Sequence, residues 1–409
     1  MSSLRPHAEP EELGFDSHRL SRIDDFFNDF VDQRKLSGWL ATVSRGGQLA
    51  YVGKGGHADR ELDKPVQDDT IWRIYSMTKP ITTIAAMMLH EEGKFDLNDS
   101  AGKWIEALRE PRVYTGGAPA NPTTVPATEP VRIWHLMSHM AGLTYGFTYG
   151  HNVDAIYRLK GYEFGWPKDA TLEQAVNDWC TSPLLFNPGE AWNYSVATDV
   201  LGYLVELWSG MTLGQFFQER ILGPLKMYDT SFFAPEEKHE RVAQLYVPVN
   251  GEAFAYPKMG QGAYREGSLQ SGGGGLVSTA HDYNRFLTML LNGGELDGVR
   301  LVSPRTISLM TENFLPGNQD LTGVARDSFS ETDMSGMGFG LGFAVLMDRA
   351  RNASSAANGL FTWGGAASTS FWVDPVEDVT VTFFTQLLPS STYPVRRHLQ
   401  QVVYQALID

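Results

Sequence analysis

Two residues separated by one helical turn are the strongest candidates for chemistry in this sequence. In the stretch IWRIYSMTKPITTIAAMMLHEEGK, residues 71–94, Ser76 stands three positions before Lys79 at the start of a densely apolar run. Residues three apart on a helix share a face, so a helix beginning near Ser76 would direct its hydroxyl and the Lys79 amine into the same space. Such a pair can perform nucleophilic catalysis, with the serine as nucleophile and the lysine as its base.

The basicity of an ordinary lysine sets a condition on this chemistry. An unperturbed lysine has a pKa of about 10.4 and is almost entirely protonated at pH 7, so it cannot accept the serine proton. Lowering that pKa by roughly 3 units requires a bias of about 4 kcal/mol against the ammonium form, which burial or a second cation can supply. Pro80 is tolerated only near the first turn of a helix, which places Ser76 at the partially positive helix N-terminus. We therefore expect Ser76 and Lys79 in a largely enclosed cleft.

The same spacing occurs a second time, so spacing alone does not identify the nucleophile. Ser100 and Lys103 lie in DLNDSAGKWIEAL, where an acidic turn precedes the serine. Ser100 is expected to cap a helix, with Lys103 on a solvated face. Ser76, in contrast, is followed by ITTIAAMML, in which an exposed lysine would be out of place. The context favours Ser76.

The elements that must position this pair are spread over the whole chain. Alternating apolar runs on both sides of an Arg-Gly-Gly turn at 45–47 predict a β-hairpin, and an amphipathic helix capped by Ser17 is expected before it, over residues 17–33. Pro/Gly-rich loops, of which APANPTTVPATEP is the clearest, and helices dominate from about residue 99 to 267. Strand-like runs return in GLGFAVLMD, STSFWVDP and DVTVTFFTQ, before a final helix from about 394 to 408.

This distribution predicts an α/β (α+β) architecture with two domains. Strands at both ends of the chain indicate a discontinuous α/β domain formed by residues 1–98 and 268–409. The residues between them, 99–267, are expected to form a mostly helical second domain. The active-site cleft would then lie between the two domains.

Composition restricts the partners and the compartment. The 409 residues include 48 acidic and 33 basic ones, for a net charge of −15, which argues against nucleic acid or an anionic membrane as the main partner. No segment reaches the roughly 18 apolar residues of a membrane helix, and the first residues lack a signal-peptide pattern, so we expect a cytoplasmic protein. The single cysteine, Cys180, excludes an intrachain disulfide and a cysteine-based metal cluster. The oligomeric state is left open.

Two further stretches complete an ordered pattern. NPGEAWNYSVATDVLGYL places a tyrosine just ahead of a helix, and FTWGGAASTSFWVDP places a tryptophan at the entry to a strand. Together with S-x-x-K at 76–79, the Tyr-Ser-Val at 194–196 and the Trp-Gly-Gly at 363–365 resemble the three motifs of the serine β-lactamase and penicillin-binding-protein superfamily. The resemblance is closest to class C β-lactamases and their esterase relatives, the family VIII carboxylesterases. LMSHMAGL, FNPGE, GGGGLVSTAHDYNRF and GMGFGLGF also look familial, so the likeness extends over most of residues 39–385.

The resemblance implies a β-lactamase-like fold, an antiparallel sheet flanked by helices, and a role for each matching residue. Ser76 would be the acylated nucleophile, and Lys79 and Tyr194 would share its proton, with a neighbouring ammonium pushing the phenol toward phenolate. The amides of Ser76 and Ala366 would form the oxyanion hole. No metal or other cofactor is implied. The substrate would lie against Val196, Trp363, Gly364 and Gly365.

Two departures from the lactam-cleaving members indicate the substrate. In those members the second motif usually ends in Asn and the third begins with Lys or His, whereas Val196 and Trp363 stand here. The missing amide removes a partner for an acylamido group, and the missing cation removes a partner for a carboxylate. The resemblance therefore implies a serine carboxylesterase that hydrolyses short-chain acyl esters through an acyl-enzyme on Ser76, with at most weak β-lactamase side activity.

Several alternatives remain open. They are a β-lactamase or D-amino peptidase, an acyltransferase that uses an alcohol in place of water, and a catalytically idle protein that binds acyl ligands on the same scaffold. An α/β-hydrolase is disfavoured because the chain contains no G-x-S-x-G. His135 and His139 are four residues apart, but without H-E-x-x-H or a cysteine partner they are expected to be structural histidines.

Overall fold

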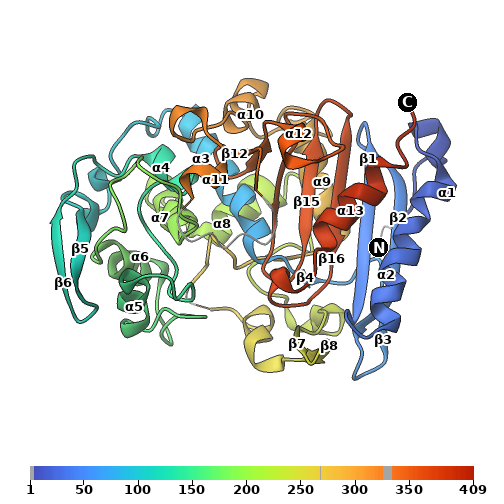
Figure 1. Cartoon of the computed structure of the whole chain (residues 1–409), viewed down its shortest axis with the longest axis horizontal. Helices are drawn as coiled ribbons and strands as arrows, with labels where there is room; N and C mark the ends of the chain where they lie inside the picture. Colours follow the sequence, from blue (N-terminus) through green and yellow to red (C-terminus); the bar gives the residue numbers. More distant parts are fainter. Residues whose placement is uncertain (1–3, 268, 326–333) are drawn as a thin grey trace.

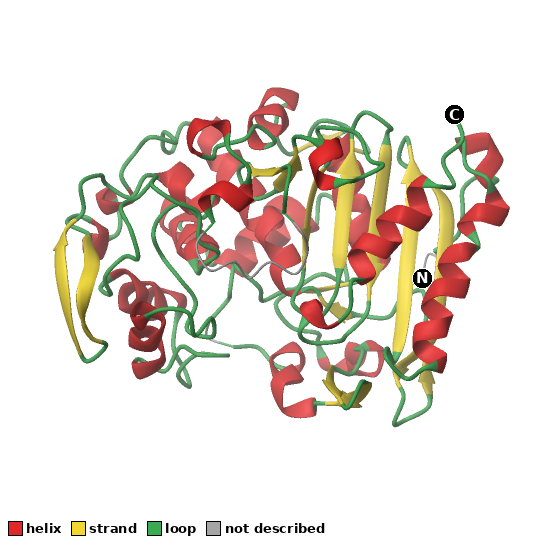
Figure 2. Cartoon of the chain, in the orientation of Figure 1, coloured by secondary structure: helices red, strands yellow, loops and turns green. Residues whose placement is uncertain are grey.

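The computed structural model describes residues 4–267, 269–325 and 334–409, and it is organised around one eight-stranded antiparallel sheet (Figures 1 and 2). The strand order is β12-β13-β14-β15-β16-β1-β2-β3, so strands from both ends of the chain meet in the middle of the sheet. The sheet strands are β1 (Gly38–Arg45), β2 (Gln48–Asp59), β3 (Lys64–Pro65), β12 (Met337–Phe339), β13 (Ala344–Leu346), β14 (Phe361–Gly364), β15 (Ser370–Asp374) and β16 (Val379–Phe384).

Helices cover both faces of this sheet, which confirms the predicted antiparallel sheet flanked by helices. Helices α2 (Arg22–Asp32) and α13 (Val395–Tyr404) cross the face seen in Figure 1, and α9 (Ala280–Leu291) packs on the opposite face. Alternate residues of a strand point to opposite faces, so Phe371 of β15 joins the core under α9 while Trp372 joins the core under α13. We call these the main core and the α13-side core.

The N-terminal elements follow the sequence prediction with one local difference. The hairpin of β1 and β2 is confirmed, with its turn at Gly46 and Gly47, both in the left-handed region. The helix expected over residues 17–33 is divided into α1 (Ser17–Leu20) and α2, and Asp16, not Ser17, caps α1 by accepting a hydrogen bond from the Arg19 amide. Asp16 takes this role because it precedes the first helical residue, Ser17, and an N-cap side chain reaches the amide three residues further on.

The middle of the chain is mostly helical but contains a hairpin where a loop was expected. APANPTTVPATEP supplies β6 (Asn121–Pro126), which pairs with β5 (Arg112–Ala118). Because β6 has a neighbour on one side only, its two prolines are tolerated on the unpaired edge. The helices of this region, which occupy the left of Figure 1, are α4 (Ile133–Met137), α5 (Asn152–Leu159), α6 (Leu172–Cys180), α7 (Ala197–Ser209) and α8 (Leu213–Phe217).

The remaining elements are short, except for one central helix. Helix α3 (Thr78–Glu91) packs against α7, and both helices contribute to the main core. The assignment of 99–267 as a separate domain stays a prediction. The short elements are β4 (Trp72–Arg73), β7 (Tyr246–Val249), β8 (Glu252–Ala255), β9 (Val277–Ser278), β10 (Glu295–Leu296), β11 (Val299–Arg300), α10 (Pro304–Met310), α11 (Leu321–Val324) and α12 (Arg349–Asn352).

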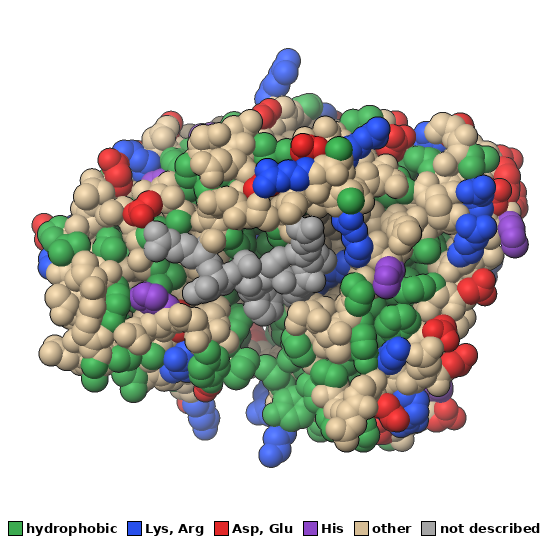
Figure 3. Space-filling model, in the orientation of Figure 1, with side chains coloured by type: hydrophobic (Ala, Val, Ile, Leu, Met, Phe, Trp, Pro, Cys, Tyr) green, Lys and Arg blue, Asp and Glu red, His purple; other side chains and the backbone are tan. Residues whose placement is uncertain are grey.

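The surface carries charges of both signs. Acidic and basic side chains are intermixed over the face seen in Figure 3, most densely over α1 and α2 at its right edge. Among the helices of the described residues, none combines the length and the hydropathy needed to cross a bilayer.

Candidate active site

Ser76 lies where the chain enters the central helix. Residues Tyr75–Met77 form a 3-10 turn that continues directly into α3, so the helix predicted to begin near Ser76 is confirmed. Tyr75 has a φ of 44°, in the left-handed region that bulky residues rarely adopt, and such strain is found where a neighbouring functional group must be held in one direction. All residues of α3 from Thr78 to Leu89 are buried, as expected for a helix that is apolar on every face.

Lys79 is enclosed beside the Ser76 hydroxyl. Its side-chain nitrogen lies within hydrogen-bonding distance of the Gly273 carbonyl oxygen at 2.6 Å, the Tyr145 hydroxyl at 2.9 Å and Ser76 Oγ at 3.3 Å. The residue is only 1% exposed, and this burial lowers the pKa of Lys79 to about 7, with the charge of Asp199 acting in the opposite direction. A pKa of about 7 leaves about half of the amine neutral at pH 7, and the neutral form is the one that a general base requires.

Asp199, on the first turn of α7, fixes the loop that contacts Lys79. Its carboxylate accepts hydrogen bonds from Ser271 Oγ at 2.5 Å and from the Gly273 amide at 3.0 Å. A Cβ on Gly273 would lie 2.3 Å from this carboxylate, so only glycine fits there. Sequence reasoning missed both Asp199 and Tyr145. An acidic residue inside the apolar helix ATDVLGYLVELW was a signal that could have identified Asp199.

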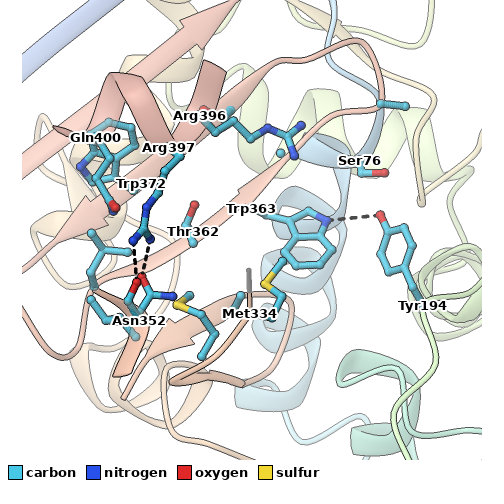
Figure 4. Close-up of a pocket in the computed structure, with 17 residues that line it drawn as sticks. Ser76, Tyr194, Met334, Asn352, Thr362, Trp363, Trp372, Arg396, Arg397 and Gln400 are labelled. Carbon is cyan, nitrogen blue, oxygen red and sulfur yellow. Dashed lines mark hydrogen bonds between the residues drawn. The ribbon is translucent and has the colours of Figure 1, made fainter. Parts of the chain in front are cut away.

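Tyr194 lies just ahead of α7, as predicted, and its ring faces Lys79. The Lys79 nitrogen is 4.5 Å from the ring centroid, and the Tyr194 hydroxyl accepts a hydrogen bond from Trp363 Nε1 at 3.2 Å (Figure 4). Burial raises the pKa of Tyr194, although hydrogen bonds with Ser76 and Trp363 act to lower it. The expectation of a phenolate is therefore wrong. Burial disfavours the charged phenolate more strongly than these hydrogen bonds favour it.

The Trp-Gly-Gly motif ends a strand instead of beginning one. Trp363 and Gly364 are the last residues of β14, and a turn over residues 365–369 leads to β15. A Cβ on Gly364 would lie 2.5 Å from the guanidinium carbon of Arg396, and one on Gly365 would lie 2.3 Å from a carbonyl oxygen just ahead of Ser76. The two glycines thus allow the turn to pack against both Arg396 and the segment that carries the serine.

Arg396 of α13 holds this turn at both ends. One guanidinium nitrogen donates to the carbonyls of Gly365 at 2.7 Å and of Thr369 at 2.8 Å. Ala366, predicted to supply an oxyanion-hole amide, lies between these two anchors. Within the described parts of the chain, the backbone amides of Ser76 and Ala366 donate to no other group. Sequence reasoning missed Arg396, because nothing in its own segment links it to the motif.

The predicted substrate contacts are brought together only in part. A cavity of about 120 Å³ begins at Ser76 and Tyr194 and is also lined by Trp363, Gly364 and Ala366 (Figure 4). Val196 does not line this cavity among the described residues, because it is 4% exposed and belongs to the main core.

The second serine and lysine pair has the structural role expected of it. Ser100 Oγ accepts a hydrogen bond from the Gly102 amide at 3.2 Å, as a cap does. Lys103 forms an ion pair with Asp99 at the surface. The prediction that Ser100 caps a helix and that Lys103 lies on a solvated face is confirmed.

The two histidines of the helix α4 region pack as structural residues. His139 is buried with Nδ1 3.3 Å from Ser195 Oγ, and its ring centroid is 4.8 Å from that of Tyr194. Burial, helped by the charge of Arg132, lowers the pKa of His135 to about 3. In the described ranges, no group of three or more His, Cys, Asp or Glu side chains could hold a metal ion.

Comparison with known proteins identifies the family of this chain. Residues 23–405 match the Beta-lactamase family, and the chain belongs to that family. Protein Rv1367c of Mycobacterium tuberculosis is 35% identical over 365 residues, with 88% of each chain covered. Esterase EstB of Burkholderia gladioli is 31% identical over 397 residues, covering 92% of this chain and 93% of that protein. The solved structure of EstCE1, described as a hydrolase with promiscuous acyltransferase activity, has a TM-score of 0.80 at 27% identity and covers 97% of this chain and 99% of its own.

Proposed function

We propose that this protein is a serine hydrolase that cleaves short-chain carboxylic esters through an acyl-enzyme on Ser76. The observation that supports this most directly is the environment of Lys79. A lysine whose pKa is lowered to about 7 by burial, 3.3 Å from a serine hydroxyl, can act as the base that ester cleavage needs. The names of EstB and EstCE1 support the same class of reaction.

Acylation begins with proton transfer from Ser76 Oγ to the neutral amine of Lys79. The bond from Oγ to the ester carbonyl carbon forms, and the carbonyl oxygen takes up negative charge between the amides of Ser76 and Ala366. The carbon–oxygen bond to the alcohol then breaks. The leaving oxygen takes the proton of Tyr194, whose raised pKa keeps it protonated, and the proton on Lys79 returns to Tyr194 to restore both groups.

Deacylation repeats these steps with water in the place of the alcohol. Lys79 and Tyr194 act as one unit that removes a proton from water as its oxygen attacks the acyl carbon. Ser76 regains its proton as the acid leaves. The unit therefore ends in its starting protonation state, and no metal or other cofactor takes part in this scheme.

The proposed substrate class rests on the neutral side chain at position 363. Trp363 presents an indole where a carboxylate-binding cation stands in lactam-cleaving relatives, and its one N–H is engaged by Tyr194. A neutral ester needs no ionic partner there, so we propose short neutral esters as substrates, with β-lactam cleavage a weak side activity at most. The net charge of −15 argues against nucleic acid or an anionic membrane as a partner, and we propose a small-molecule ester in the cytoplasm as the substrate.

The second candidate is acyl transfer to an alcohol. The description of EstCE1 as a hydrolase with promiscuous acyltransferase activity supports it, because the same acyl-enzyme can be attacked by an alcohol. Adding a competing alcohol and measuring the ratio of new ester to free acid separates the two activities.

A rate survey tests the proposal. Hydrolysis of p-nitrophenyl esters of increasing acyl length is compared with that of a chromogenic cephalosporin, after each rate is divided by its uncatalysed rate. We expect kcat/KM for the acetyl or butyryl ester to exceed that for the cephalosporin by at least about 100-fold. Labelling of Ser76 by a fluorophosphonate probe should accompany this activity. Preference for the cephalosporin would refute the esterase, and the absence of both turnover and labelling would favour an idle binding protein.

A further inference from the structure

The cavity at Ser76 continues past Trp363 along the sheet face that α13 covers. In Figure 4, Ser76 and Tyr194 stand at one end, Trp363 in the middle, and Trp372, Arg397 and Gln400 at the far end. We call the part beyond Trp363 the α13 cavity. Nothing in the reaction described above uses it.

The walls of the α13 cavity differ in character. Its floor is mainly apolar, with Thr362 and Ser370 as its polar members, and comes from β12 to β15 and the residue before β14, whereas its roof comes from α12 and α13 and is polar. Arg397 in the roof is already tied to α12, because its guanidinium donates to Asn352 Oδ1 at 3.0 Å and to the Asn352 carbonyl at 2.6 Å. The floor consists of Met337, Ala344, Leu346, Leu360, Thr362, Ser370 and Trp372.

The position of Tyr194 decides which half of an ester faces this space. The oxygen of the leaving alcohol must lie against the Tyr194 hydroxyl to receive its proton. That hydroxyl is bonded to Trp363 Nε1 at 3.2 Å, and Trp363 lines the entrance to the α13 cavity. The alcohol portion therefore begins at the entrance, whereas the acyl portion is fixed on Ser76.

We propose that the α13 cavity binds the alcohol portion of the substrate and that this portion is a mainly apolar ring or branched chain of at most about six carbons. The inference rests on the proposed function, and it adds that specificity lies in the alcohol as well as in a short acyl group. The size follows from the volume. The whole cavity, which includes the end at Ser76, has about 120 Å³ and is smaller than an apolar cavity of about 150 Å³ that holds a benzene ring in another protein, so about six carbons is an upper limit for the alcohol portion.

Two neighbouring glutamines of α13 provide a matched pair of variants. Gln400 is half-buried and lines the cavity, whereas Gln401 is exposed on the same helix and does not line it. Gln400→Phe adds an aromatic ring to the roof, and Gln401→Phe adds the same ring outside. The effect of phenylalanine on helix propensity is the same in both.

The test compares three acyl esters in both variants and the wild type. For cyclohexyl acetate relative to ethyl acetate, we expect Gln400→Phe to lower the kcat/KM ratio about tenfold or more, and Gln401→Phe to change it by less than about twofold. The ratio for ethyl hexanoate relative to ethyl acetate should stay the same in all three proteins. A fall in the hexanoate ratio instead would assign the cavity to the acyl portion, and no change in either ratio would also overturn the proposal.

The binding of cyclohexanol, measured through the quenching of tryptophan fluorescence, separates this inference from the proposed function. Trp363 and Trp372 line the cavity, and neither variant adds a tryptophan. We expect Gln400→Phe to weaken binding about tenfold and Gln401→Phe to leave it unchanged. If no ester is hydrolysed but this pattern holds, the esterase proposal fails while the alcohol site stands. If esters are hydrolysed and cyclohexanol binding does not distinguish the variants, the alcohol site fails alone.

Discussion

At the scale of single residues, Lys79 joins catalysis and stability through one property. Its burial makes the amine neutral near pH 7, and the same burial makes the ammonium form unfavourable in the folded protein. Both consequences can be measured, because each changes with pH in a direction fixed by the sign of the pKa shift.

The first consequence concerns the rate. Because only the neutral amine accepts the Ser76 proton, we expect kcat/KM for a neutral ester to rise with pH and to level off above an apparent pKa of about 7. A pH profile with an uncharged substrate measures this. Activity that stays constant from pH 5.5 to 9, a range chosen to span about two units on either side of that pKa, would remove Lys79 as the base.

The second consequence concerns the free energy of unfolding. The pKa of Lys79 is about 7 when folded against about 10.4 when unfolded, so the unfolded chain binds the extra proton between these values. Stability is therefore reduced below pH 10.4, and the reduction is complete below pH 7. The free energy of unfolding of Lys79→Met, relative to that of the wild type, should therefore be higher at pH 6 than at pH 9 by about 3 kcal/mol in denaturant titrations. Equal differences at the two pH values would contradict the buried, neutral lysine.

The two serines that precede a lysine provide an internal control for the nucleophile. We expect Ser76→Ala to abolish ester hydrolysis with little effect on folding, and Ser100→Ala to retain activity while losing about 1 kcal/mol of stability through its cap. Steady-state rates and melting curves measure both. Equal loss of activity in two folded variants would show that Ser76 is not the nucleophile.

The residues that sequence reasoning identified are those with a recognisable local spacing or motif. Ser76, Lys79 and Tyr194 meet in the structure as predicted, and the enclosed cleft required by the lysine is present. Asp199 and Arg396 were missed because their partners lie far away in the sequence. The phenolate form of Tyr194 was predicted wrongly because the degree of burial, which decides its pKa, cannot be read from a motif.

At the scale of elements, the turn after β14 depends on a contact with α13. Arg396 donates to the carbonyls at both ends of this turn, and Gly364 leaves the space that the guanidinium occupies. The turn carries the Ala366 amide, so this contact positions one half of the proposed oxyanion hole. Arg396 is a positioning residue, because it acts on the reaction through the backbone.

Two substitutions should break the same contact from opposite sides. We expect Arg396→Met and Gly364→Ala each to lower kcat about 10- to 100-fold with little change in KM, since an oxyanion donor acts mainly in the transition state. The double variant should be no slower than the worse single one. Arg396→Lys should recover part of the loss. Multiplicative losses, or a change in KM alone, would show that the contact does not position the amide.

Element boundaries were predicted well where the pattern was periodic and poorly where it was not. The hairpin of β1 and β2 and the strands β15 and β16 follow turn residues and apolar alternation. Strand β14 was missed because it has only four residues and ends in glycine. The β5–β6 hairpin was missed because the prolines of β6 favour a loop unless the strand has an unpaired edge.

At the scale of the whole molecule, one continuous core joins the helical region to the sheet. The main core includes α3 and α7 together with side chains of α9, β14, β15 and β16. Helix α3 is buried along its length inside this core. Neither the helical region nor the sheet can therefore expose its part of the main core without disturbing the other. The helical region and the sheet therefore share one hydrophobic core.

We accordingly expect a single cooperative unfolding transition. Tryptophan fluorescence, far-UV circular dichroism and calorimetry should give one melting temperature, with the calorimetric and van't Hoff enthalpies in agreement. Two separated transitions would show instead that residues 99–267 unfold independently of the sheet.

The position of β1 in the sheet also has a consequence for synthesis on the ribosome. Leu40 of β1 lies opposite Phe384 of β16, so the inner edge of the first strand obtains its partner only when the end of the chain emerges. At about 5–20 residues per second, this leaves the edge of the nascent hairpin unpaired for roughly 20 to 70 s. During that interval, it is a template for strands of other chains, and a nascent chain would depend on chaperones or on a temporary cover to avoid aggregation.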